Sequence, residues 1–247
     1  MSGRTRFRLK IREHLHAPEA KRDYNEQHFS EAASRYDFAT RAMSLGRDGA
    51  WKKALVAALP EQAEPVCVDL ASGTGDIAFL LARRYPQGQV IGNDLTGAML
   101  AVACKRNRSP RVNFVQGDML ATGLADASAD IVTGSYAVRN APDLPQAFRE
   151  IHRILKPGGT LALLDFSKPA NRLVQRFQYA LLRYWCGLWG LLLHGNPEIH
   201  AYIAASLATY PDRPTLYALI QESGFERIRT RRFYFGVLEL LLLRKPE

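Results

Sequence analysis

The segment that most constrains the fold is Val66–Ala78, with the sequence VCVDLASGTGDIA. Its apolar run ends at an acid, Asp69, and is followed by a turn that contains Gly73 and Gly75. A buried strand, a glycine turn and a helix start, in this order, form the first unit of a parallel α/β sheet. Such a sheet presents an adenosyl ligand at the carboxyl end of its first strand. The segment therefore predicts an α/β domain that binds an adenosyl ligand at this turn.

The acids near the glycines distinguish between two adenosyl ligands. Residues 73–78, GTGDIA, also fit the dinucleotide pattern G-x-G-x-x-G/A, which would make the chain a nicotinamide dehydrogenase. The pyrophosphate would then lie at the helix N-terminus, where Asp76 would repel it. The ammonium and sulfonium groups of S-adenosylmethionine would instead be attracted by Asp69 and Asp76. We therefore predict S-adenosylmethionine as the cofactor and methyl transfer as the reaction.

From residue 66 onward, strand patterns alternate with helix patterns, as a parallel sheet requires. We predict an α/β fold with a Rossmann-like, doubly wound sheet that is mostly parallel and ends in an antiparallel strand pair. A helical segment precedes it, and a helical insertion follows strand 5. The expected parallel strands are Val66–Leu70, Gln89–Asn93, Val112–Gln116, Ile131–Gly134 and Thr160–Leu164, and the antiparallel pair is Arg227–Phe235 and Val237–Arg244. The expected helices of the domain are Asp76–Tyr85, Gly97–Arg106, Leu144–Leu155 and Pro214–Ser223.

The 247 residues suit one methyltransferase domain, which we place at residues 26–247. The net charge of +9 is concentrated at the ends of the chain, and we expect residues 1–25 to form a flexible basic arm. This arm contacts anionic lipid or nucleic acid, or is a solvated tail. No nucleic-acid module is recognisable, so we expect no nucleic-acid partner. The three cysteines offer no disulfide framework, and we expect a cytoplasmic protein, with a peripheral membrane contact left open.

The insertion at about residues 171–213 contains a strongly apolar stretch, residues 180–193, ALLRYWCGLWGLLL. These fourteen residues are too few to span a bilayer. A helix that is apolar on nearly every side either packs in the core or forms the entrance for a lipophilic substrate, docked at a membrane surface. The stretch therefore indicates a lipophilic small-molecule substrate as one of two readings.

Polar residues follow successive strands of the predicted sheet. Asp94 can accept hydrogen bonds from both ribose hydroxyls, although an acid at this place also caps helices. Asp118 can accept the adenine amine while Met119 packs on the ring, with a plain turn as the alternative. Ser135 ends the fourth strand, close to where the methionine part would lie. The predicted cofactor-binding residues are Asp69, Gly73, Thr74, Gly75, Asp94, Leu95, Asp118, Met119 and Ser135.

Further motifs occur in a fixed order along most of the chain. They are Tyr36-Asp37, Ser44-x-Gly46, Trp51-Lys52, Asp69–Asp76, Gln116–Asp118, Arg139-Asn140, Arg153–Gly159, Leu164–Pro169 and Ser223–Phe225. With these motifs, the chain from Tyr36 to Lys245 resembles the ubiquinone/menaquinone biosynthesis C-methyltransferase family. The resemblance implies a class I methyltransferase fold, S-adenosylmethionine as methyl donor and methylation of a ring carbon on a prenylated quinol. Carried over by position, it implies cofactor contacts at Thr74, Asp94, Asp118, Met119 and Ser135.

The sequence departs from the pattern of that family at three places. Asp48-Gly49 replaces the usual His-Arg, Tyr136-Ala137 replaces Phe-Gly, and Leu241 replaces a customary histidine. By analogy these positions lie toward the methyl acceptor, whereas the cofactor loop is intact. Another lipophilic phenol or a terpenoid therefore stays open as the acceptor, as does a non-catalytic adenosyl-binding subunit of a quinone-synthesis complex.

Methylation of a ring carbon requires a neighbouring hydroxyl to lose its proton, in a dry site that stabilises the resulting charge. We assign charge stabilisation to Arg139 and orientation of the hydroxyl or carbonyl to Asn140. Tyr36, Tyr136 and Tyr202 are the predicted substrate-pocket residues. The sulfonium methyl is already electrophilic, so we predict no metal site. The sequence does not decide between a monomer and a homodimer.

Overall fold

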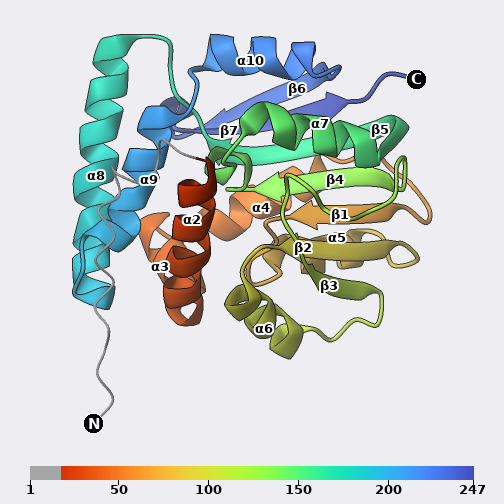
Figure 1. Cartoon of the computed structure of the whole chain (residues 1–247), viewed down its shortest axis with the longest axis horizontal. Helices are drawn as coiled ribbons and strands as arrows, with labels where there is room; N and C mark the ends of the chain where they lie inside the picture. The colour runs from red at the N-terminus through yellow and green to blue at the C-terminus, as the bar shows by residue number, and fades with distance from the viewer. Residues whose placement is uncertain (1–17) are drawn as a thin grey trace.

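The computed structural model describes residues 18–247, which form a single seven-stranded sheet in the order β3-β2-β1-β4-β5-β7-β6 (Figure 1). The strands are β1 (Val66–Leu70), β2 (Gln89–Asp94), β3 (Val112–Gln116), β4 (Ala129–Ser135), β5 (Leu155–Phe166), β6 (Glu226–Phe233) and β7 (Leu238–Arg244). The pairs from β3 to β5 are parallel, whereas β7 runs antiparallel to both β5 and β6. The predicted fold class is confirmed.

Helices cover both faces of the sheet, because successive residues of a buried strand point to opposite sides. In β1, Cys67 packs with helices α4 (Asp48–Ala57) and α5 (Asp76–Arg84). The next residue, Val68, packs with α7 (Leu144–Ile154) and α10 (Arg213–Glu222). The other helical elements are α2 (Pro18–Ala32), η1 (Ala33–Arg35), α3 (Tyr36–Met43), α6 (Gly97–Arg106), η2 (Val138–Asn140), α8 (Arg172–His194), α9 (Glu198–Thr209) and η3 (Tyr234–Gly236).

The largest difference from the expected strands is the start of β5, which lies at Leu155 rather than at Thr160. Leu155 pairs with Ala129, and pairing resumes only at Thr160 and Ile131. Residues 156–159, KPGG, therefore form an irregular segment within the strand. Helix α7 ends at Ile154, so β5 follows it directly.

The predicted arm at residues 1–25 is too long. Its residues 1–17 lie outside the described part of the chain, but residues 18–25 belong to α2. Lys21, Tyr24 and Asn25 are buried, and the ring of Tyr24 lies 5.3 Å from that of Tyr202 on α9. The helical spacing of the buried residues places one face of α2 against the domain.

The insertion after β5 consists of α8 and α9, which lie side by side at one end of the sheet, on the left in Figure 1. Helix α8 has two different faces. Leu182 and Cys186 are buried in the main core, whereas Phe177 and Tyr184 are 70% and 76% exposed. Among the described helices, none is long and apolar enough to cross a bilayer.

Candidate active site

A cavity lies at the carboxyl ends of β1 to β4, where the glycine turn after β1 meets the ends of its neighbours. Six predicted cofactor residues line it together with Arg22 and Phe29 of α2. These six residues are Gly73, Asp94, Leu95, Asp118, Met119 and Ser135. The parallel sheet thus brings the polar residues at the strand ends to one place. We refer to this space as the cofactor cavity.

Asp94 shapes the cofactor cavity by bonding to two backbone segments. Its Oδ2 accepts the Gly73 N–H at 2.7 Å and its Oδ1 accepts the Thr96 N–H at 2.8 Å. Burial raises the pKa of this carboxyl above its ordinary value. A carboxylate has about four lone-pair sites, so both oxygens keep acceptor capacity for two hydroxyls. The same side chain therefore fixes the glycine turn and faces the cavity.

Asp118 at the far side of the cofactor cavity is held in a similar way. Its Oδ1 accepts the Leu120 N–H at 2.9 Å, and its Oδ2 lies 3.1 Å from Nε of Arg22. Arg22 belongs to α2, so this helix closes one side of the cavity. This ion pair was not predicted, because Arg22 falls within the predicted arm.

The other three predicted cofactor residues support the turn without lining the cavity. Asp69 is buried below it, accepts a hydrogen bond from Thr133 Oγ1 at 2.7 Å, and has a pKa that burial raises to about 7. Thr74 donates its hydroxyl to Asp37 at 2.6 Å. Gly75 has a φ of 90°, and a Cβ there would lie 2.8 Å from the ring of Phe79, so the turn requires glycine. Their direct contact with a cofactor stays a prediction.

Some buried polar side-chain atoms of the cofactor cavity make no hydrogen bond within the described residues. Within residues 18–247, the buried atoms Asn93 Oδ1, Ser135 Oγ and Asn140 Oδ1 have no hydrogen-bond partner, and all three residues line this cavity. Buried polar atoms of folded proteins are nearly always paired. These atoms, together with the carboxylates of Asp94 and Asp118, fit a ligand as rich in hydroxyl and amine groups as S-adenosylmethionine.

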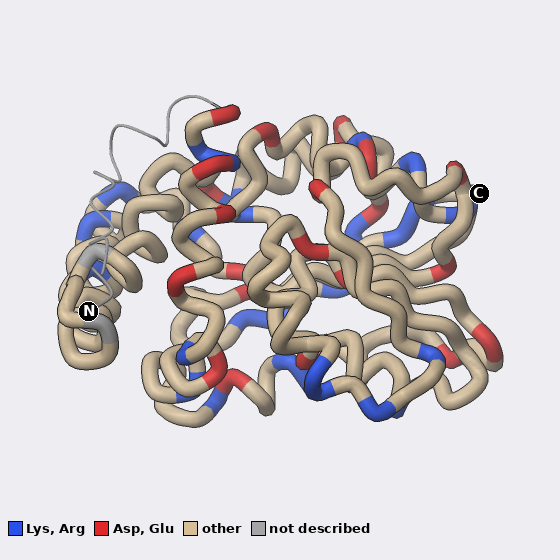
Figure 2. Tube along the Cα trace, turned by 60° about the horizontal axis from the view of Figure 1, so that its bottom comes forward, with Lys and Arg blue, Asp and Glu red and all other residues tan. Residues whose placement is uncertain are grey.

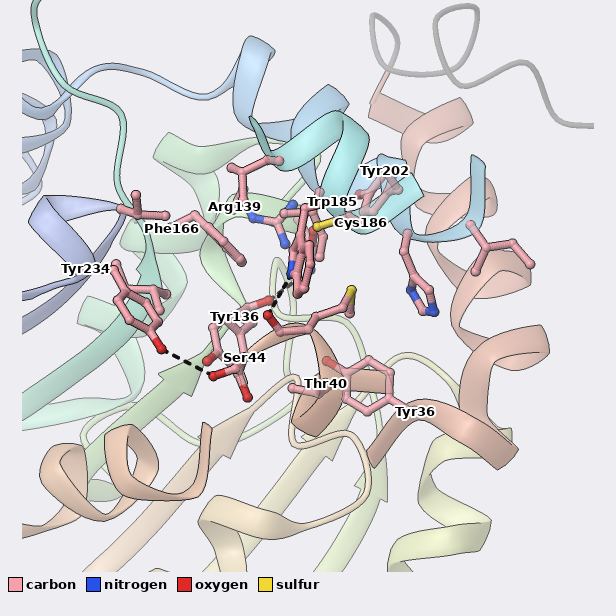
Figure 3. A pocket seen from close by; sticks show the side chains of 18 of the residues that line it. Tyr36, Thr40, Ser44, Tyr136, Arg139, Phe166, Trp185, Cys186, Tyr202 and Tyr234 are labelled. Carbon is pink, nitrogen blue, oxygen red and sulfur yellow. Dashed lines mark hydrogen bonds between the residues drawn. The ribbon is translucent and has the colours of Figure 1, made fainter. Parts of the chain in front are cut away.

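A second cavity, of about 420 Å³, lies between the strand ends and helices α2, α3, α8 and α9 (Figure 3). Its lining is mainly apolar. Trp185 of α8, Phe166 of β5 and Met43 of α3 contribute to its wall. Tyr202 of α9, one of the predicted substrate-pocket residues, also lines it. We refer to this space as the acceptor cavity. Four residues line both cavities, which therefore adjoin; they are Phe29, Tyr36, Tyr136 and Asn140.

Arg139 lies on the wall of the acceptor cavity, in the short helix η2 that follows β4. The residue is only 4% exposed, its Nε lies 3.4 Å from Asp165 Oδ1, and its Nη1 donates to Ser206. The guanidinium carbon lies 5.3 Å from the centre of the Phe166 ring. Because a guanidinium has five N–H groups, these bonds leave donors for a ligand. The site thus offers a fixed positive charge next to an apolar cavity.

Comparison with known proteins agrees with this geometry. The ubiE/COQ5 methyltransferase family matches residues 18–242. The chain belongs to this family. It is similar to a 2-phytyl-1,4-naphtoquinone methyltransferase of Thermosynechococcus vestitus, with 36% identity over 219 residues, which are 88% of this chain and 97% of that protein. It is also similar to the ubiquinone/menaquinone biosynthesis C-methyltransferase UbiE of Desulfotalea psychrophila, with 32% identity, covering 86% and 87% of the two chains.

A solved structure supports the fold independently. The S-adenosylmethionine-dependent methyltransferase of Mesorhizobium loti superposes with a TM-score of 0.58 at 19% identity, covering 77% of this chain and 95% of that one. The predicted family and the predicted enzyme class are both confirmed by these matches.

In this methyltransferase, α2 supplies contacts to the active site that were not predicted. Lys21 Nζ donates to the carbonyl oxygen of Ala141 at 2.7 Å, and Asn25 Nδ2 donates to that of Asn140 at 2.8 Å. Burial, followed by the charge of Arg139, lowers the pKa of Lys21 to about 8. Both side chains hold η2, on which Arg139 and Asn140 lie. The helical spacing of residues 21, 24, 25 and 28 was the signal that could have revealed this face.

Proposed function

We propose that this methyltransferase uses S-adenosylmethionine to methylate a ring carbon of a lipophilic, prenylated quinol in quinone biosynthesis. The observation that carries the proposal is the junction of the two cavities, where a polar cavity adjoins an apolar one of about 420 Å³. The relatives described above support it, because they are named for methylation of phytyl-naphthoquinone and for ubiquinone and menaquinone biosynthesis.

Each part of the site has a role in this reaction. When bound, S-adenosylmethionine supplies a methyl group that is electrophilic because it is attached to a sulfonium. The apolar wall of the acceptor cavity binds the prenylated ring and excludes water. Arg139 stabilises the negative charge on the ring oxygen, and Asn140, at the junction of the cavities, orients that oxygen.

The test is methyl transfer from labelled S-adenosylmethionine to demethylated prenylquinols of the benzoquinone and naphthoquinone types, with the products identified by mass. We expect a new methyl group on a ring carbon of at least one of them. The same rings without a prenyl chain serve as controls and should react more slowly, because they leave the apolar wall unfilled. Cofactor binding with transfer only to other phenols or terpenoids would assign a different acceptor. Binding without any transfer would indicate a non-catalytic adenosyl-binding subunit.

We further propose that the outer face of α8 docks on an anionic membrane, where such a substrate resides. Leu173, Phe177 and Tyr184 recur at helical spacing on this exposed face. The arginines of the helix lie along one flank of this apolar stripe and can reach lipid headgroups; they are Arg172, Arg176 and Arg183. In Figure 2 the left end of the molecule, where α8 and α9 lie in Figure 1, is mostly uncharged with a few basic positions. The opposite side of α8 lines the acceptor cavity through the buried residues Leu182 and Cys186, so a docked helix would place the cavity next to the bilayer.

Replacing both exposed aromatic residues tests this contact. We expect Phe177→Glu/Tyr184→Glu to weaken sedimentation with phosphatidylglycerol vesicles about tenfold or more, because two buried aromatic contacts are lost. Ile228→Glu is the control, since Ile228 is an exposed apolar residue on the edge strand β6 and not on α8. Equal vesicle binding by all three proteins would contradict docking through α8. Self-association that the double variant abolishes would instead assign the face to a homodimer.

A further inference from the structure

Tyr136 occupies the junction between the two cavities and donates its hydroxyl to a buried acid. It follows the end of β4, and its φ of 56° is in the left-handed region that non-glycine residues rarely adopt. The ring lines both cavities. Figure 3 shows Tyr136 in the wall of the acceptor cavity. Its hydroxyl lies 2.9 Å from Asp48 Oδ1 on α4, and Asp48 is 7% exposed. These are two of the three places at which the sequence departs from the family pattern.

Asp48 is one end of a chain of ion pairs that runs beneath the glycine turn. Its Oδ2 lies 2.7 Å from Lys52 Nζ, which lies 3.0 Å from Asp76 Oδ2. Asp76 Oδ1 in turn pairs with Arg106 at 2.6 Å, and Arg106 pairs with Asp37 at 2.9 Å. This series of ion pairs contains three carboxylates, of Asp48, Asp76 and Asp37, and the two cations of Lys52 and Arg106. One negative charge is therefore in excess. Among these pairs, Asp48 lies beside one cation, Lys52, whereas Asp76 lies between two, Lys52 and Arg106. A carboxylate beside fewer cations accepts a proton more readily, which favours Asp48 over Asp76.

We propose that Asp48 accepts, through the hydroxyl of Tyr136, the proton that the ring hydroxyl of the methyl acceptor loses. The inference rests on the proposed function. The O–H bond of the acceptor breaks and its proton joins Tyr136 Oη, while the Tyr136 proton moves to Asp48 Oδ1. The ring oxygen keeps the electron pair, which makes the neighbouring carbon nucleophilic. Once that carbon has gained the methyl group, it loses its hydrogen to solvent as a proton, and Asp48 returns a proton to the ring oxygen.

The protonation state of Tyr136 suits this transfer of a proton from the methyl acceptor to Asp48, which we call the relay. Burial, followed by the nearby charge of Asp48, raises the pKa of its phenol well above the ordinary value. Tyr136 therefore stays neutral, and passes on one proton as it receives another. The titratable and charged groups that face Asp48 are Lys52 of α4, Tyr136 just after β4 and Tyr36 of α3. Burial raises the pKa of Tyr36 to about 12, so Tyr36 does not compete as a base.

Other side chains of the acceptor cavity are less suited to this task. The guanidinium of Arg139 has no acceptor atom. Tyr202 donates its hydroxyl to Asn25 Oδ1. His28 and His200 line the acceptor cavity but not the cofactor cavity, so neither lies at the junction where the methyl group must cross. Tyr136 lies at that junction and is bonded to a carboxylate.

Removal of one hydroxyl tests the relay. We expect Tyr136→Phe to lower kcat about 10²-fold while the KM values for both substrates change little, because proton acceptance is lost and the ring is kept. The residual rate should rise about tenfold per pH unit, since hydroxide must then take the proton. Tyr217→Phe is the matched control, because Tyr217 also donates to a buried carboxylate, Glu239, at 2.6 Å, outside both cavities.

A second variant protects the test against a structural effect of the first. Asp48→Asn should reduce kcat to the same extent, and the Tyr136→Phe/Asp48→Asn double variant should lose no more than either single variant, because the relay acts as one unit. Full activity of Tyr136→Phe, or multiplicative losses in the double variant, would overturn the relay while leaving the proposed function intact. Absence of transfer by the wild-type protein to any quinol would overturn both.

Discussion

We expect an Arg139→Lys variant to bind the cofactor normally but to transfer methyl groups about 10²–10³-fold more slowly than the wild-type protein. Arg139 lines the acceptor cavity and not the cofactor cavity, so the two measurements should separate. A lysine keeps a positive charge next to Asp165 but loses the planar fork of donors. Charge on the ring oxygen is then stabilised less well, and kcat falls while the cofactor Kd stays the same.

Lysine is preferred to alanine because Arg139 and Asp165 form a buried ion pair. Removal of the cation alone would leave Asp165 buried and unpaired, at a cost of about 3–5 kcal/mol in the free energy of unfolding. Arg153→Lys is a suitable control, since Arg153 pairs with Glu150 outside both cavities. Calorimetry gives the cofactor Kd, and saturating kinetics give kcat. A parallel loss of cofactor affinity would show that Arg139 supports the fold rather than the chemistry.

The arrangement of the cofactor cavity was predictable because local patterns determine it. Strand patterns separated by helices imply a parallel sheet, and a parallel sheet brings the residues after its strands to one edge. Asp94 and Ser135 are the last residues of β2 and β4, Asp118 follows β3 by two residues, and all three line one cavity. This arrangement could therefore be predicted without knowledge of which helices pack around the site.

Contacts between residues far apart in the sequence were not predictable in the same way. Asp48 and Tyr136 stood out as separate departures from the family pattern, but nothing in the sequence indicates that they are hydrogen-bonded. Lys21 and Asn25 were assigned to a charged arm because the basic residues around them suggested solvent. The energy that holds α2 in place comes from burial against α9 and η2, which only the folded chain brings together.

The apolar insertion left two readings open, core packing and a lipophilic entrance. Helix α8 combines features of both, since Leu182 and Cys186 join the core and also line the acceptor cavity. Its exposed side stayed hidden in the sequence because apolar residues occur on nearly every side of the helix. Periodicity separates faces only where their polarity differs.

Asp94 is the residue whose loss should most weaken cofactor binding. We expect Asp94→Ala to raise the Kd for S-adenosylmethionine about 10²–10⁴-fold, because each of two hydrogen bonds to a charged group contributes about 1.5–3 kcal/mol. The variant also loses the hydrogen bonds that Asp94 accepts from the Gly73 and Thr96 N–H groups, so the glycine turn is less stable. Titration calorimetry with S-adenosylhomocysteine measures the loss without turnover.

A variant of a helix N-cap outside both cavities separates the loss of cofactor affinity from the loss of stability. Asp212 also accepts a backbone N–H, from Thr215 at 3.2 Å, but it lines neither cavity. Asp212→Ala should lower the free energy of unfolding by about 1 kcal/mol and leave the cofactor Kd unchanged. If Asp94→Ala lowered the free energy of unfolding to a similar extent but kept its affinity for the cofactor, Asp94 would stabilise the turn and would not bind the ribose. A loss of affinity far beyond the loss of stability is the result that assigns the two ribose hydroxyls to this carboxylate.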